Sequence, residues 1–133
     1  MTIARVALPV AAHTAFDYWV PAGLEVGCGQ LVRVVLGRRA LAGVVVAVGD
    51  ATEVPGDRLQ PIREVVAGVP PLPPDVLALA EFVARYYQEP PGLVLAQMLP
   101  PLGRAAPRAP VAVIALALTA EGRAALPALL ARA

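Results

Sequence analysis

Residues 30–48 read QLVRVVLGRRALAGVVVAV, two runs of apolar and β-branched residues on either side of the turn sequence GRR at 37–39. A glycine-containing turn between two such runs is typical of a β-hairpin. We therefore expect strands over residues 30–36 and 40–48. Gly43 inside the second run indicates a bulge or a close approach of a neighbouring backbone.

The segments around this hairpin continue the pattern of short strands. Apolar and aromatic residues predict further strands at 3–10, 16–20 and 61–66, separated by turns that contain glycine and proline. Short strands at such close spacing are typical of a small β-barrel or sandwich. The strand pattern ends at a run of prolines between residues 70 and 74.

Beyond these prolines the apolar residues recur with the period of a helix. We expect two helices between residues 74 and 99, divided by two prolines at 90–91 and packed on the strands. Tyr86 and Tyr87 are interpreted as the core and rim of this helix packing. The apolar positions that recur at helical spacing in the first helix are Val76, Leu79, Ala80, Val83 and Tyr87.

The C-terminal residues predict a second, smaller segment. Residues 101–110 form a basic linker rich in proline and alanine, and 111–118 read as a strand. Thr119 is placed to cap a last helix, which we expect Pro127 to interrupt and which reaches the last residue without a cap, as in a truncated chain. We therefore expect one domain over 1–100, and in 101–133 a linker and the start of the next region.

The composition defines the broad class of protein. Of the 133 residues, 58% are apolar and 16% charged, which excludes a chain disordered by low hydrophobicity. The longest apolar runs, 41–48 and 109–118, are shorter than the roughly 20 residues of a membrane helix. The N-terminus also lacks the basic-then-apolar pattern of a signal peptide. These features predict a soluble, cytoplasmic protein.

Several kinds of chemistry are excluded by the residues that the chain lacks. With one cysteine and one histidine, it can form neither an internal disulfide nor a Cys/His zinc site. It has no lysine, so it cannot contain a Walker phosphate loop. We therefore expect no catalytic activity, interpret Cys28 as a small buried or half-buried residue, and place His13 in a loop before Phe16.

The most unusual local sequence is Phe16-Asp17-Tyr18-Trp19. In a strand, Phe16 and Tyr18 face one side, and Asp17 and Trp19 face the other. In one interpretation the first pair fills the core and Asp17 is solvated. In the other, the aromatic faces stack nucleic-acid bases. A carboxylate suits such a site only where it meets a hydroxyl donor with no phosphate beside it, as at a free strand end or a ribose.

Several collinear motifs resemble one known family. ARVALPV at residues 4–10, FDYWVP at 16–21, GQLVRVVLGRR at 29–39, and the tyrosines, proline, glycine and leucines of 84–100 are similar to the N-terminal region of the PriA (primosomal protein N′) replication-restart helicases. The segment 118–126 extends the resemblance, which implies that 101–133 contains the start of the next region, on the winged-helix side. The resemblance as a whole implies a mainly β, α+β fold: a small OB-like β-barrel, two packed helices, and a strand–helix extension.

The resemblance also implies a function and a site. Domains of this type bind DNA and capture the 3′ end of the leading strand at a stalled or collapsed replication fork. By this resemblance Asp17 accepts a hydrogen bond from the terminal 3′-hydroxyl, with Phe16 and Tyr18 beside it, and Gly37 lets the nucleotide approach closely. The family has a lysine just before the fifth strand, where this chain has Gln60, which we take as a candidate DNA contact.

A set of arginines forms the second part of the predicted site. All 11 basic residues are arginine, which GC-rich codon usage explains as well as phosphate binding does. Those near the predicted hairpin could neutralise backbone phosphates, the alternative being that they are simply solvated. The candidate phosphate contacts are Arg33, Arg38, Arg39 and Arg63.

The expected partners follow from the same resemblance. They are forked DNA with a free 3′-hydroxyl end and, through the full-length protein, other primosome proteins and single-strand-binding protein, in a cytoplasmic, nucleoid-associated location. The family's ATP, magnesium and zinc sites lie outside the residues that match here, so no cofactor is expected. Two alternatives stay open. One is a single-strand binder that ignores ends, and the other is a module that docks on helicase lobes and partner proteins without contacting DNA.

Overall fold

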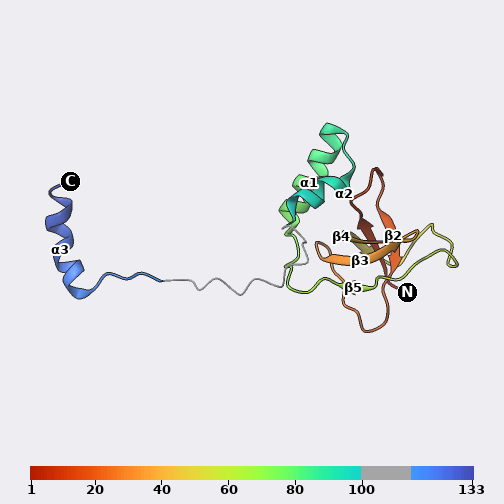
Figure 1. The fold of residues 1–133 in the computed structure, drawn as a ribbon, viewed down its shortest axis with the longest axis horizontal. Helices are drawn as coiled ribbons and strands as arrows, with labels where there is room; N and C mark the ends of the chain where they lie inside the picture. Colours follow the sequence, from red (N-terminus) through yellow and green to blue (C-terminus); the bar gives the residue numbers. More distant parts are fainter. Residues whose placement is uncertain (100–114) are drawn as a thin grey trace. The chain divides into compact units, whose positions relative to one another are not determined.

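The computed structural model describes residues 1–99 and 115–133, and the chain divides into two units, Met1–Gly103 and Arg104–Ala133 (Figure 1). The first unit contains five strands followed by two helices. The strands are β1 (Ile3–Ala7), β2 (Phe16–Trp19), β3 (Leu31–Leu36), β4 (Arg39–Gly49) and β5 (Glu64–Val65), and the helices are α1 (Pro74–Tyr87) and α2 (Pro91–Met98). The second unit contains α3 (Ala120–Leu130).

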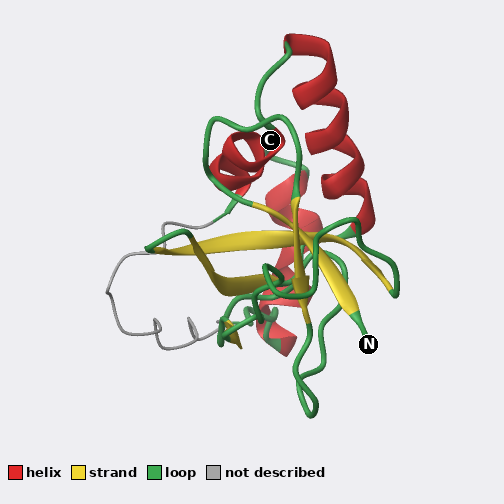
Figure 2. Cartoon of the chain, turned by 90° about the vertical axis from the view of Figure 1, so that its right-hand side faces the viewer, coloured by secondary structure: helices red, strands yellow, loops and turns green. Residues whose placement is uncertain are grey.

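The strands form one antiparallel sheet in the order β2-β1-β4-β3-β5, and its ends meet to close a barrel (Figure 2). The closing contact is a bridge between Trp19, at the end of β2, and Pro61, just before β5. The Trp19 N–H donates to the Gln60 carbonyl at 3.0 Å, and the Ile62 N–H donates to the Trp19 carbonyl at 3.0 Å. The fold is therefore mainly β with packed helices and OB-like, as predicted.

The central hairpin forms as the sequence predicted. β3 pairs with β4 from Leu31↔Val44 to Leu36↔Arg39, so the connection is a two-residue turn of Gly37 and Arg38. Gly37 has a φ of +62°, which an L-residue with a side chain adopts only with strain. A glycine in the first turn position matches the twist of the two strands.

Two predicted strands are shorter in the structure. The strand expected over 3–10 ends at Ala7, and the one expected over 61–66 keeps only Glu64 and Val65 in the sheet. Pro9 explains the first difference, since it has no N–H to donate to a neighbouring strand. Around β5 the chain still bonds to the sheet at single points, since the Arg63 N–H donates to the Arg33 carbonyl and the Val66 N–H donates to the Leu31 carbonyl.

The barrel interior is filled by alternate residues of the strands. Tyr18 is 3% exposed and lies among valines and Ile62 in this core. Its hydroxyl donates to the Val35 carbonyl at 3.0 Å, which satisfies the one polar group of the ring. The fully buried members include Val6, Val32, Val34, Val45 and Ile62.

A second core joins the helices to the outer side of the barrel. Ala80 and Ala84 of α1 and Val94 and Leu95 of α2 pack against residues of the strands. Gly92 lies so close to the backbone of Leu8 that a side chain there would overlap its carbonyl group. This contact fixes α2 against the end of β1.

The predicted packing of the two adjacent tyrosines is wrong. Tyr86 is 69% exposed and Tyr87 is 65% exposed, and Leu79 and Phe82 are also exposed. The helix buries Ala80 and Ala84 instead, which share the second core with residues of α2. Phe82 stacks on Tyr86 with ring centroids 5.6 Å apart, so these aromatics pack on one another at the surface.

Two further predictions are corrected. Cys28 is exposed, because it lies in the turn before β3 and only its neighbour Gly29 is buried. Pro127 does not interrupt the last helix, which continues to Leu130. Proline removes one hydrogen bond of this solvent-exposed helix, and the Ala131 N–H still donates to the Pro127 carbonyl at 3.1 Å.

The start of the last helix is confirmed. The Thr119 side chain accepts a hydrogen bond from the Gly122 N–H at 3.1 Å, as an N-cap does. The strand predicted over 111–118 is wrong for residues 115–118, which form no strand. Its remainder and the predicted linker at 101–110 lie outside the described residues.

Candidate nucleic-acid interface

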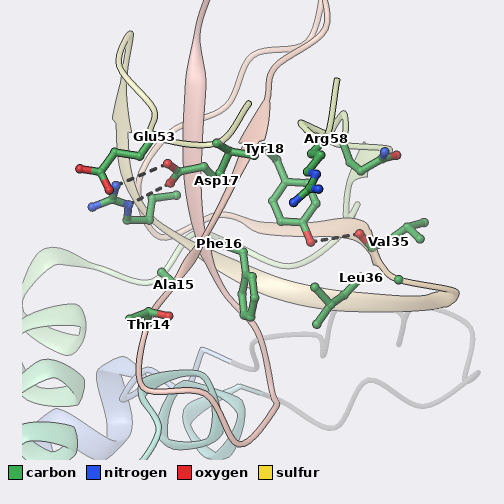
Figure 3. Close-up of a pocket in the computed structure, with 13 residues that line it drawn as sticks. Thr14, Ala15, Phe16, Asp17, Tyr18, Val35, Leu36, Glu53 and Arg58 are labelled. Atoms are coloured by element: carbon green, nitrogen blue, oxygen red, sulfur yellow. Dashed lines mark hydrogen bonds and ion pairs between the residues drawn. The ribbon is translucent and has the colours of Figure 1, made fainter. Parts of the chain in front are cut away.

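A cavity of about 610 Å³ opens on the barrel between β2, the end of β3 and the segment 53–60 (Figure 3). Its volume falls within the roughly 300–1,000 Å³ of typical ligand sites. β2 and β3 are not neighbours in the sheet, so only the folded barrel brings these segments together. All five residues that the sequence predicted for end binding line it: Phe16, Asp17, Tyr18, Gly37 and Gln60.

Asp17 is the most constrained polar group of the cavity. Its Oδ1 accepts from Arg5 Nε at 2.9 Å, and its Oδ2 accepts from Thr52 Oγ1 at 2.8 Å and from Arg5 Nη2 at 3.5 Å. The side chain is 8% exposed, so the interpretation of Asp17 as a solvated residue is wrong. The hydrogen bond from Arg5 lowers the pKa of Asp17, burial opposes this, and Thr52 adds to the lowering. Asp17 is therefore an ionised acceptor.

The two aromatic residues of β2 have different surroundings. Tyr18 is in the core with its hydroxyl already bonded, and burial raises the pKa of that hydroxyl. Phe16 is only half-buried and packs against the core from the cavity side. Figure 3 shows both rings beside the cavity. Phe16 is thus the aromatic ring of the two that a ligand can reach.

Residues 5–100 match the family model of the PriA 3′ DNA-binding domain. The chain belongs to this family. It is 34% identical over 100 residues to the replication restart protein PriA of Haemophilus influenzae, and 31% identical over 100 residues to that of Rickettsia conorii. Each match covers 75% of the chain, but only 14% and 15% of these relatives. The matching part of the chain is therefore a DNA-binding domain, and it spans about a seventh of the proteins it resembles.

The turn residue Gly37 lies at the rim of the cavity. Apart from its two chain neighbours, no residue of 1–99 or 115–133 lies within 4 Å of the position that its side chain would occupy. The space in front of the turn is therefore open, and the requirement for glycine comes from the backbone angle.

The segment before β5 supplies two polar side chains. Gln60 is exposed and lines the cavity, as does Arg58 two residues earlier. Sequence reasoning took Gln60 as the candidate because of its alignment with a family lysine. Arg58 is the positively charged residue of this segment that lines the cavity. Its position two residues before Gln60 is the feature of the sequence that could have indicated it.

The four candidate phosphate-binding arginines do not line the cavity. Arg33 points outward from β3 and pairs with Glu64 of β5 at 2.8 Å, so its guanidinium already has a partner. Arg38 and Arg39 are exposed at the hairpin turn next to Gly37. Arg63 is exposed and lies three residues after Gln60 in the sequence, directly before β5. Contact of these side chains with DNA stays a prediction.

Two residues of the site were missed by sequence reasoning. Arg5 lies on β1 directly opposite Asp17, and Thr52 lies in the loop after β4. A signal for Arg5 existed, since it is a charged residue inside an otherwise apolar strand. The pairing register that places it beside Asp17 could not be read from the sequence.

In residues 1–99 and 115–133 no group of three or more His, Cys, Asp or Glu residues is placed to hold a metal ion. Within the same residues no helix has both the length and the apolar character needed to span a membrane.

Proposed function

We propose that this domain captures the free 3′ end of a DNA strand at a stalled or collapsed replication fork, with Asp17 accepting a hydrogen bond from the terminal 3′-hydroxyl. The observation that carries this proposal is the placement of an ionised carboxylate in a cavity bordered by an aromatic ring. A carboxylate has about four acceptor sites. Arg5 and Thr52 use up to three of them, which leaves capacity for a hydroxyl donor.

The other residues of the cavity have matching roles. Phe16 stacks on the terminal base or sugar, an interaction of about 1–3 kcal/mol per base. The open space at Gly37 admits the nucleotide close to the turn. Gln60 and Arg58 at the rim contact the nucleotide or its phosphate.

The same carboxylate explains selectivity for an unmodified end. A 3′-phosphate would bring a second negative charge beside Asp17 in a partly desolvated cavity, where like charges repel strongly. Glu53 also lines the cavity and adds to this repulsion. We expect the domain to prefer a 3′-hydroxyl over a 3′-phosphate.

The wider role is that of one module in a larger replication-restart protein. The matched region covers 14–15% of the PriA relatives. We expect helicase activity, with its ATP, magnesium and zinc, to belong to other segments of such a protein. In this proposal the domain is not itself an enzyme. It works in the bacterial nucleoid, and primosome proteins and single-strand-binding protein act through the whole protein.

Competition titrations with matched oligonucleotides ending in a 3′-hydroxyl or a 3′-phosphate test the proposal. A hydrogen bond to a charged acceptor contributes about 1.5–3 kcal/mol, or roughly 10- to 150-fold in affinity. Asp17→Ala should lose that much affinity for the 3′-hydroxyl end, together with the preference. Asp17→Asn should bind the hydroxyl end only modestly less well and accept the phosphate end better.

Glu81→Gln is the matched control, because it removes a carboxylate from the ion pair with Arg85 on α1, outside the cavity. It should leave both affinities unchanged. If Asp17→Ala discriminates between the two ends as the wild type does, Asp17 is not the group that recognises the hydroxyl. If the wild type itself binds both ends equally well, the domain is a single-strand binder that ignores ends. If the wild type binds no DNA even at low salt, it is a protein-docking module.

A further inference from the structure

The contact between Arg5 and Asp17 is built into the sheet. β1 and β2 pair so that Arg5 lies directly opposite Asp17, and Arg5 is the one exposed residue of β1. The pairing of β1 with β4 shifts register between Arg5 and Val6. Bulges of this kind re-aim a side chain next to a binding site. The strand thus directs its single charged residue to the edge of the cavity.

The carboxylate of Asp17 is held from two directions. Arg5 approaches with Nε and Nη2, and Thr52 donates its hydroxyl to Oδ2 from a loop 35 residues further along the chain. The Thr52 oxygen in turn accepts from the Val54 N–H at 3.1 Å, so its own proton is committed to Asp17. Held in this way, the carboxylate has a fixed orientation before any ligand arrives.

We propose that Arg5 and Thr52 are positioning residues that preorganise Asp17 for the 3′-hydroxyl. Neither needs to touch the nucleotide, because each acts by fixing the plane of the carboxylate, so that its free acceptor sites are already aligned for the hydroxyl. Preorganisation raises affinity because the ligand does not have to order the group that binds it. This inference rests on the proposed function of Asp17 as the hydroxyl acceptor.

The charges around Asp17 support the same role. Arg5 on β1 faces it directly, while Glu53 and Arg58, from the segment that covers the cavity, line the same space. Arg5 holds the pKa of Asp17 below its usual range, and Thr52 contributes in the same direction. Asp17 thus remains an acceptor at every pH at which DNA binding would be measured.

The first test measures binding of an oligothymidine with a free 3′-hydroxyl to the full chain. Thr52→Val keeps the shape of the side chain but removes the donor, and should weaken binding roughly 3- to 10-fold. Thr52→Ser restores the hydroxyl and should restore the affinity. Arg5→Gln should weaken binding at least as much, while Glu81→Gln, a change to the ion pair on α1, should have no effect.

The second test separates positioning from a general loss of structure. The carboxyl ¹³C signal of Asp17 reports its titration directly by NMR. The pKa of Asp17 should rise in Arg5→Gln, because the largest cause of its lowering is gone, and rise less in Thr52→Val. Destabilisation of the barrel elsewhere would not move this signal.

The outcomes distinguish the two proposals. If Asp17→Ala abolishes end preference while Thr52→Val and Arg5→Gln bind like the wild type, the positioning role is wrong and the proposed function stands. If Asp17→Ala keeps the preference, the proposed function itself fails. A wild-type affinity in Thr52→Val together with an unmoved Asp17 titration would overturn the role of Thr52 specifically.

Discussion

Tyr18 joins two opposite sides of the barrel through a single hydrogen bond. It lies on β2, and its hydroxyl donates to the carbonyl of Val35 on β3. Tyr18→Phe should lower the free energy of unfolding by about 1 kcal/mol at neutral pH, because the Val35 carbonyl loses its donor. Urea denaturation of both proteins measures this difference.

The same residue makes the difference depend on pH. Burial raises the pKa of Tyr18 in the folded state, so its contribution to stability is complete below the unfolded value of about 10. As the pH rises above that value, the unfolded chain ionises first and the contribution is lost. The stability gap between wild type and Tyr18→Phe should therefore shrink above pH 10. A gap that stays constant at alkaline pH would contradict the buried hydroxyl.

At this scale the sequence predicted the residues of the cavity better than their contacts. Phe16, Asp17 and Tyr18 are adjacent in the chain, so strand alternation and the family resemblance were enough to select them. The ion pair of Asp17 depends on the register of β1 against β2 and on Thr52, far away in sequence. Tertiary pairing decides such contacts, and no local pattern encodes it.

Among the elements, the hairpin of β3 and β4 offers a test of phosphate binding. Arg38 and Arg39 are free at the turn, whereas Arg33 is engaged by Glu64. For single-stranded DNA each phosphate contact contributes about 0.7 to the slope of log affinity against log salt. The double change Arg38→Gln with Arg39→Gln should reduce this slope by about 1.4. Arg33→Gln should change it less.

Titrations at several salt concentrations measure the slopes. Arg85→Gln is the control, since this arginine pairs with Glu81 on α1, outside the cavity. An unchanged slope in the double variant would mean that the turn does not contact the backbone of DNA.

The contact between α2 and β1 depends on the lack of a side chain. A Cβ at Gly92 would overlap the carbonyl of Leu8, and a backbone group cannot move aside as a flexible side chain can. Gly92→Ala should cost at least about 3 kcal/mol, since α2 must shift and open the second core. Gly49→Ala, where nothing lies within 4 Å, should cost less than about 0.5 kcal/mol. Equal denaturation midpoints for the two variants would contradict this packing.

The helices show where periodicity is informative and where it is not. The spacing of apolar residues located α1 between Pro74 and Tyr87. Of the positions it selected, Ala80 is buried and Val76 and Val83 are half-buried, but Leu79 and Tyr87 are exposed. The packing of α1 beside α2 decides which of its apolar residues are buried, and no local pattern encodes that packing.

For the molecule as a whole, residues 1–103 should behave as an independent domain. Both hydrophobic cores and every residue lining the cavity lie within residues 3–99. A fragment of residues 1–103 should therefore keep the urea midpoint and the oligonucleotide affinity of the full chain. Denaturation and binding measured side by side check this. A loss of either property would show that residues 104–133 contribute to the domain.

The overall architecture was predictable because the separate sequence patterns all indicate the same fold. Short strands, a proline run and a helical period together indicate a barrel followed by helices. The closure of the barrel was not predictable, since it depends on a bridge from Trp19 to Pro61, a residue that cannot donate a hydrogen bond. The cavity could not be located without that closure, because β2 and β3 meet across it only in the folded barrel.

The closing bridge gives the protein an optical signal of its own. Trp19 is the single tryptophan of the chain, and its backbone makes the hydrogen bonds that join β2 to the segment before β5. Its fluorescence therefore comes from one known place, the seam of the barrel, while circular dichroism in the far ultraviolet is dominated by the helices. Recorded together during refolding, the two signals would measure the rate of barrel closure separately from the rate of helix formation.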